Sequence, residues 1–150
     1  MHMEGAGMLV SQLLKAKGDL VFTIGPEETV ASAAAQLVVR RVGALVVLGP
    51  AEEVVGIVSE RDVVRVLAEQ GAGALTRPVS ACMTAEVIFA DPGETVDALL
   101  TRMTDRRIRH LPVCRERRLV GIVSIGDLVK RKIQEAEEEA QGLKAYIAAG

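Results

Sequence analysis

The sequence is poor in aromatic residues. Its 150 residues include no tryptophan and only three aromatic side chains, Phe22, Phe89 and Tyr146. Proteins that bind single-stranded nucleic acid by stacking bases on rings need more of them, so this class is disfavoured. The core must instead be built from aliphatic side chains. A chain of this length suits one domain, or two small halves that share a core.

Long apolar runs and an excess of one charge are also missing. The longest strongly apolar run, residues 44–48, is far shorter than the roughly 20 residues of a membrane-spanning helix. Eighteen basic and 20 acidic residues give a formal charge of −2, without the basic excess typical of nucleic-acid binding. Residues 1–7 lack the features of a secretory signal. We therefore expect a cytoplasmic protein with neither a membrane nor a nucleic acid as partner.

The two cysteines do not indicate a disulfide framework or a metal site. Cys82 and Cys114 are 32 residues apart, and neither has a second cysteine nearby in a CxxC pattern. Cys114 and His110 are four residues apart and could share one face of a strand as a nucleophile and base. No third residue that would orient the histidine is apparent, and Cys114 aligns with an apolar residue in the repeat described next. We expect no catalytic residue and no bound metal.

An internal repeat organises the chain. Residues 56–62 (GIVSERD) return as residues 121–127 (GIVSIGD), with five of the seven positions identical and an offset of 65. Upstream, residues 28–48 align with residues 94–114 at an offset of 66, with seven of the 21 positions identical. The sequence is therefore divided into an N-terminal extension (1–9), two repeats (10–75 and 76–132) and a C-terminal helix extension (133–150).

Both repeats contain the same order of predicted elements. A short apolar segment precedes a turn and an Ala- and Leu-rich helix, for which Thr29 or Thr95 is the expected N-cap. Two β-rich runs separated by a hairpin-length turn follow, and a second helix begins at Ser59 or Ser124. The predicted fold is α/β (α+β), with a β-α-β-β-α order and a sheet covered on both faces. The segments before the second helix are 21–24, 29–41, 44–48 and 54–59, and then 87–90, 95–107, 111–114 and 119–124.

The Ser-x-x-Asp motif at the start of each second helix permits two interpretations. In the first, Ser59 with Asp62, and Ser124 with Asp127, form a capping box. In the second, the free N–H groups of the helix accept a phosphate, the hydroxyl bonds a phosphate or sugar oxygen, and the carboxylate accepts both hydroxyls of a ribose. Arg61 adds a cation that could reach a phosphate. The second copy has a glycine at that position, so the two sites should differ in charge preference.

With these motifs, the chain resembles a tandem pair of cystathionine-β-synthase (CBS) domains, also called a Bateman module. The resemblance covers about residues 10–132 and rests on the paired GIVSxxD motifs, the Glu-Thr-Val helix starts and the Arg-His-Leu-Pro-Val run at 109–113. It implies two pseudo-symmetric β-α-β-β-α units packed sheet to sheet, with two ligand clefts between them. It also implies an adenosine-containing ligand such as AMP, ADP, ATP, NAD or S-adenosylmethionine, and a homodimer.

The same resemblance implies which residues would contact a ligand. The serines would contact phosphate or ribose, the aspartates would hold ribose hydroxyls, and the first-strand and hairpin-start positions would line the adenine and phosphate region. Phe22 and Phe89 are the only rings expected near an adenine. The implied ligand-binding residues are Ser59, Arg61, Asp62, Ser124, Asp127, Thr23, Ile24, Gly43, Ala44, Phe89, Ala90, Arg109 and His110.

The two copies differ at these positions. The first copy has no counterpart of His110, and it has Leu45-Val-Val where the second has Leu111-Pro-Val. Occupancy of both clefts is therefore not implied. The alternative is a degenerate pair whose clefts are filled by their own side chains.

A stripe of apolar residues continues beyond the repeats. Val129, Ile133, Ala136, Ala140, Leu143 and Ile147 follow one another at heptad-like steps of 4, 3, 4, 3 and 4. We expect this stripe to pack on a second subunit or on its own module. The sequence as a whole predicts a regulatory module that binds an adenine nucleotide and modulates a separate partner protein. The alternative is a ligand-independent homodimeric scaffold.

Overall fold

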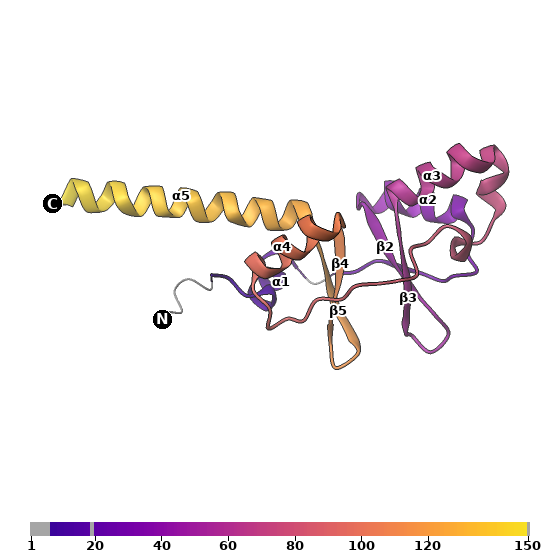
Figure 1. The fold of residues 1–150 in the computed structure, drawn as a ribbon, viewed down its shortest axis with the longest axis horizontal. Helices are drawn as coiled ribbons and strands as arrows, with labels where there is room; N and C mark the ends of the chain where they lie inside the picture. Colours follow the sequence, from indigo (N-terminus) through magenta and orange to yellow (C-terminus); the bar gives the residue numbers. More distant parts are fainter. Residues whose placement is uncertain (1–6, 19, 150) are drawn as a thin grey trace.

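A computed structural model describes residues 7–18 and 20–149 (Figure 1). The N-terminal extension predicted for residues 1–9 lies largely outside the described residues. The helices are α1 (Val10–Lys17), α2 (Val30–Arg40), α3 (Glu60–Gln70), η2 (Gly71–Thr76), η3 (Val79–Ala81), α4 (Val96–Arg106) and α5 (Ile125–Ala149). The strands are β1 (Thr23–Ile24), β2 (Ala44–Leu48), β3 (Val54–Ser59), β4 (His110–Arg115) and β5 (Arg118–Ser124).

The corresponding helices α2 and α4 begin and end in the same way. The Thr29 hydroxyl accepts a hydrogen bond from the Ser32 amide, and the Thr95 hydroxyl accepts one from the Ala98 amide. Both predicted N-caps are therefore confirmed. Both helices end at an arginine in the left-handed conformation, with φ of 56° at one C-cap and 55° at the other. The repeat thus extends from the sequence to the backbone geometry.

The two sheets are related but unequal. In the first, β1 pairs in parallel with β2, and β2 pairs antiparallel with β3. In the second, β4 and β5 form an antiparallel pair, and the predicted strand at 87–90 is reduced to a single bridge between Ala90 and Val113. Its two hydrogen bonds run from the Ala90 amide to the Pro112 carbonyl and from the Cys114 amide to the Ala90 carbonyl.

The two hairpins lie next to each other at the centre of the molecule, with helices α2 and α3 beyond one and α1 and α4 beyond the other (Figure 1). Each repeat has its own aliphatic core, as its composition requires. Leu45 and Val58 are fully buried in the first core, and Leu99 and Leu111 are fully buried in the second. The α/β fold with two similar units is confirmed.

The segments that open the two repeats are exchanged between these cores. Helix α1, through Val10 and Leu13, packs into the core of the second repeat. Helix η3 and the residue after it, through Val79 and Cys82, pack into the core of the first. Backbone bonds hold each exchanged segment, such as that from the Val10 amide to the Glu94 carbonyl at 2.9 Å. Each core is therefore formed by one sequence repeat without its first segment, together with the first segment of the other repeat.

The exchange explains the glycine of the repeated motif. A Cβ atom on Gly56 would lie 2.6 Å from Met83 Sδ and 2.9 Å from the Thr84 carbonyl oxygen. A Cβ atom on Gly121 would lie 2.7 Å from a methyl carbon of Leu14. Met83 and Leu14 are themselves equivalent positions, 69 residues apart. In each β-strand the exchanged segment crosses directly over the glycine, with backbone and a side chain at Gly56 and with a side chain alone at Gly121.

The C-terminal helix is continuous with the second repeat. Helix α5 begins directly after Ser124 and runs for 25 residues to Ala149, extending well beyond the rest of the molecule (Figure 1). Leu128 is fully buried, but every residue from 136 to 149 is exposed. This part of the apolar stripe therefore does not pack on its own module.

Candidate functional site

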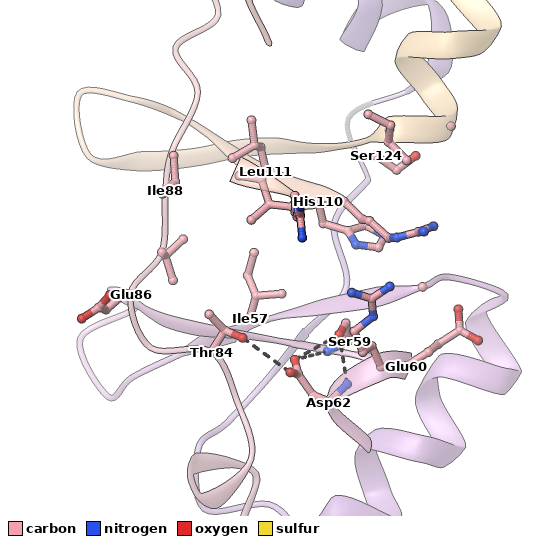
Figure 2. Close-up of a pocket in the computed structure, with 18 of the residues that line it drawn as sticks. Ile57, Ser59, Glu60, Asp62, Thr84, Glu86, Ile88, His110, Leu111 and Ser124 are labelled. Carbon is pink, nitrogen blue, oxygen red and sulfur yellow. Dashed lines mark hydrogen bonds between the residues drawn. The ribbon is translucent and has the colours of Figure 1, made fainter. Parts of the chain in front are cut away.

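A cleft of about 720 Å³ lies between the two repeats (Figure 2). One side is formed by the end of β3 and the start of α3, and the opposite side by the start of β4 and the junction of β5 with α5. The linker at residues 84–88, which follows the exchanged segment η3, forms a further wall. The apolar lining is aliphatic, consisting of Ile57, Val87, Ile88, Ile108, Leu111 and Ile125.

Asp62 is the most heavily bonded side chain of the cleft. It is 4% exposed, and its Oδ2 accepts hydrogen bonds from the amide and the hydroxyl of Ser59, at 2.9 and 3.0 Å. The Ser59 hydroxyl in turn accepts from the Asp62 amide, which completes a capping box. On Oδ1, Arg65 donates at 2.9 Å and Thr84 at 3.5 Å. The capping interpretation is therefore confirmed, and it places Asp62 in the cleft wall in a fixed orientation (Figure 2).

His110 faces this network from the other repeat (Figure 2). A Cβ atom on Gly43 would lie 3.0 Å from His110 Nε2, so glycine at that position leaves room for the imidazole. Burial lowers the pKa of His110 below its usual range, although Asp127 and Glu60 act in the opposite direction. The imidazole is therefore neutral at pH 7, and an anion placed beside it would favour its protonation.

The charged lining contains more cations than carboxylates. The arginines of the cleft are Arg61, Arg65, Arg107 and Arg109, and the carboxylates are Glu60, Asp62 and Glu86. Since Arg65 is paired with Asp62, three arginines remain against two glutamates. These three come from both repeats, so an anion bound between them would contact both halves of the molecule.

The equivalent carboxylate in the second repeat has a different partner. Asp127 forms a capping box with Ser124, but it also forms an ion pair with Lys17 Nζ at 2.8 Å. Lys17, at the end of exchanged helix α1, also donates to the Ile122 carbonyl at 2.8 Å. Burial alone would raise the pKa of Asp127, but the hydrogen bonds from Lys17 and Ser124 outweigh it and lower the pKa. Asp127 does not line the cleft.

The predicted ligand-binding residues fall into two groups. Those that line the cleft are Gly43, Ser59, Arg61, Asp62, Arg109, His110 and Ser124. The remainder, Thr23, Ile24, Ala44, Phe89, Ala90 and Asp127, do not line it; Ile24, Ala44 and Ala90 are buried. Neither predicted ring reaches the cleft, since Phe89 is 41% exposed elsewhere and Phe22 lies beneath the Arg40 guanidinium. The ligand contacts themselves remain predictions.

Most of the linker wall and Arg65 were not predicted from the sequence. Thr84 and Glu86 lie in a segment without a repeated motif, so no pattern singled them out. The available signal was positional: Thr84 follows Met83, which aligns with core residue Leu14. Arg65 belongs to helix α3, where an arginine is ordinarily solvent-exposed.

The arrangement does not resemble a nucleophilic catalytic site. Burial raises the pKa of Cys114, which favours the neutral thiol over the reactive thiolate, and Cys114 is not among the cleft residues. Within residues 7–18 and 20–149, no three His, Cys, Asp or Glu side chains lie close enough together to hold a metal ion. No helix in this described part is long and apolar enough to cross a membrane.

Comparison with known families and curated proteins gives a consistent result. The family model described as CBS domain matches residues 18–69 and 79–133. The CBS domain-containing protein CBSX3, mitochondrial, of Arabidopsis thaliana is 37% identical, over 99% of this chain and 78% of that protein. The CBS domain-containing protein YhcV of Bacillus subtilis is 32% identical, over 81% of this chain and 84% of that protein.

Solved structures share the same architecture. The CBS-domain containing protein ATU1752 of Agrobacterium tumefaciens has a TM-score of 0.83 and 41% identity, covering 88% of this chain and 98% of that one. The CBS domain pair of protein MJ0100, solved in complex with 5′-methylthioadenosine and S-adenosyl-L-methionine, has a TM-score of 0.77 and 26% identity. That match covers 85% of this chain and 98% of the other.

Proposed function

This chain belongs to the CBS-domain family as a tandem pair, and from that premise we propose that it is a regulatory module, not an enzyme, that binds an adenosine-containing ligand. The observation that supports this function best is the cleft, where the capped N-terminus of α3, which carries Arg61, faces arginines of the second repeat. The MJ0100 pair, with its bound adenosine derivatives, supports the ligand class. Candidate ligands are AMP, ADP, ATP, NAD and S-adenosylmethionine.

The charges of the cleft favour a ligand that carries phosphate. Arg61 lies in the first turn of α3, where the helix dipole also attracts an anion, and Arg109 lies across the cleft. A guanidinium binds phosphate oxygens with two donors, which makes it well suited to AMP, ADP, ATP or NAD. S-adenosylmethionine carries a sulfonium cation instead and would gain less from these arginines.

The ribose would be held by Asp62. Its Oδ1 currently accepts from Arg65 and, at 3.5 Å, from Thr84. The Arg65 side chain is 48% exposed and has a second acceptor in the Cys82 carbonyl, so it can yield the carboxylate oxygen to a ribose hydroxyl. The aliphatic lining would then enclose the adenine without an aromatic stack.

One ligand per chain, bound at the Asp62 end of the cleft, is the stoichiometry that we propose. At the other end, Lys17 already neutralises Asp127 by pairing with Oδ2, which also accepts from the Ser124 amide, and Asp127 does not line the cleft. The pairing of Lys17 with the Ile122 carbonyl holds the ammonium group in place. A ligand at that end would have to displace Lys17, whose side chain is 28% exposed, from a carboxylate outside the cleft. A ligand beside Asp62 has to displace only the more exposed Arg65 and enters an existing cleft.

Thermal unfolding with AMP, ATP, NAD and S-adenosylmethionine tests the proposal. A ligand present at 100 times its dissociation constant stabilises the native state by about 2.7 kcal/mol, which raises Tm by about 5–10 °C in a chain of this size. Arg61→Ala should weaken binding of a phosphate-containing ligand by about 10- to 100-fold, because it removes a charge-assisted hydrogen bond. Arg115→Ala, an exposed change outside the cleft, is the control. A native protein that responds to none of these ligands would exclude the sensor function.

Regulation requires a separate protein that distinguishes the free and bound states. A ligand that bridges the repeats shifts the balance between two arrangements of the repeats only if it binds one arrangement better than the other. Arginines from both repeats would provide that difference in affinity, since the ligand contacts all of them in one arrangement only. A homodimer and a cytoplasmic location complete the proposal; both free cysteines fit a reducing compartment.

The second candidate, a ligand-independent homodimeric scaffold, is favoured by the exposed apolar residues of α5 and predicts no thermal response to any nucleotide.

A further inference from the structure

The exposed part of α5 carries an apolar stripe that no described part of its own chain covers. Ile133, Leu143 and Ile147 are 55%, 60% and 67% exposed, and Val129 is 44% exposed. Exposed apolar residues at heptad spacing on a continuous helix are typical of a helix that pairs with another. The stripe spans residues 129–147, which corresponds to about 27 Å of helix.

The stripe faces away from the body of the molecule. The body-facing side is marked by Leu128, which is fully buried, and by Arg131 and Glu135, whose side chains are 21% and 22% exposed. At 100° per residue, the centre of this side lies roughly 130° around the helix from the stripe. A second helix can therefore approach the stripe without displacing Leu128, Arg131 or Glu135. Lys132, at the edge between the two sides, pairs with Asp97 of α4 at 2.9 Å.

Charges beside the stripe identify the partner as another copy of this helix. With Ile133 and Ile147 at position a and Leu143 at position d, Lys132 and Glu139 fall at position g. Positions e are filled by Lys130, Glu137 and Lys144. In a parallel pair, each g position faces the e position five residues later on the other helix. Glu139 then faces Lys144, which gives two attractive pairs per dimer. Lys132 faces Glu137, but within its own chain it is already paired with Asp97 at 2.9 Å and with Glu135 at 3.0 Å.

An antiparallel pair has the opposite electrostatics. Aligning the stripes antiparallel places Ala136 opposite Ala140, and like positions then face each other, g with g and e with e. Glu139 would face Glu139, Glu137 would face Glu137, and Lys130 would face Lys144, so each of these charged pairs repels. Within a parallel coiled coil, isoleucine at a with leucine at d, as at Ile147 and Leu143, favours two strands over three or four.

We propose that two copies of this protein associate through a parallel coiled coil of α5, with its stripe at residues 129–147 as the seam. The interface is self-complementary and places the two CBS pairs on the same end of the coiled coil. Ala136 and Ala140 bury little surface, and Gly142 weakens the helix. The dimer is therefore weak enough for monomer and dimer to coexist at the protein concentrations used in sedimentation. This inference does not depend on ligand binding.

Sedimentation of the full chain over a range of concentrations tests the interface. Wild type should show a reversible monomer–dimer equilibrium, and Leu143→Asp should raise the dimer dissociation constant by about 100-fold or more, because an apolar seam residue is lost from both helices. Gln141→Asp, an exposed change two residues away and outside the stripe, is the matched control and should retain the dimer. A monomeric wild type overturns the proposal. A dimer that survives Leu143→Asp also overturns it, and assigns association to another surface such as exposed Val38 and Val39 of α2.

A disulfide trap tests the orientation. In the parallel pair, Leu143→Cys places two thiols in one layer of the seam, within the Cα separation of about 4.4–6.8 Å that a disulfide needs. In the antiparallel pair, the two introduced thiols are about 15 Å apart along the axis. Mild oxidation should therefore give a covalent dimer of Leu143→Cys and not of wild type, whose Cys82 is buried and Cys114 half-buried. Absence of a covalent dimer at concentrations where the variant is dimeric by sedimentation would contradict the parallel arrangement.

Discussion

Gly56→Ala is expected to destabilise the protein and to reshape the cleft, whereas Gly121→Ala is expected to be much milder. The Cβ atom introduced at position 56 would lie 2.9 Å from the Thr84 carbonyl oxygen. That oxygen cannot easily withdraw, because it accepts from the Ile57 amide at 2.9 Å while the Thr84 amide donates to the Ile57 carbonyl at 2.8 Å. The added methyl group therefore has to break or shift two backbone hydrogen bonds.

The magnitude follows from two opposing contributions. Overpacking a closely filled site costs about 1–3 kcal/mol. Replacing glycine by alanine stabilises by about 0.4–1 kcal/mol, because the unfolded chain loses freedom. We expect a net loss of about 1–2 kcal/mol for Gly56→Ala, or a Tm lowered by about 2–8 °C. At Gly121 the methyl would meet only the flexible side chain of Leu14, so the expected loss is below about 1 kcal/mol.

Urea unfolding of the two variants and wild type, analysed with a common slope, gives the comparison directly. Gly56→Ala should also weaken nucleotide binding, since Thr84 donates to Asp62 in the cleft wall. Two results would contradict this expectation: Gly121→Ala is the more destabilised variant, or Gly56→Ala is as stable as wild type. The first would mean that Leu14 cannot move away from β5, and the second that the linker after η3 moves freely over β3.

Three further predictions concern single side chains. Lys17→Ala should lower stability by about 1 kcal/mol at neutral pH. Asp127, whose lowered pKa stabilises the fold above about pH 4 and stops doing so in acid, should then titrate at a higher pH, as followed by NMR. His110→Asn should flatten the fall in stability on acidification below about pH 6.5, because the unfolded chain takes up a proton there that the buried imidazole resists. Thr29→Ala and Thr95→Ala should each cost about 1 kcal/mol in urea unfolding, since each removes an N-cap hydrogen bond; unequal losses would contradict the symmetry of the caps.

Much of the fold could be predicted from the sequence because the relevant signals are local. The caps at Thr29 and Thr95, and the capping box at Ser59, involve residues three positions apart, so the pattern alone predicts them. The strands from Ala44 to Ser59 follow from alternation of apolar runs and turns. The predicted strand at 87–90 is too long, since only Ala90 pairs with β4. The extent of this pairing depends on how the linker crosses the sheet.

The site was predicted only in part. The residues of the cleft that belong to repeated motifs, such as Ser59, Asp62 and His110, could be found by alignment. Thr84 and Glu86 could not, because they reach the cleft through the exchange of segments between the two cores. The predicted equivalence of Asp62 and Asp127 likewise ignored Lys17, which is 110 residues away from Asp127 in the sequence.

The repeat, the helices with their caps and the paired glycines at positions 56 and 121 can be recognised in the amino-acid sequence, since each is a relation between nearby residues or between equivalent positions. Three features became visible only in the folded chain: α1 closes the second core, Lys17 pairs with Asp127, and the cleft opens beside Asp62. These contacts join residues far apart in the chain, and their formation depends on which apolar faces bury one another. The two repeats carry equivalent Ser-x-x-Asp motifs, and packing gives the two aspartates different partners.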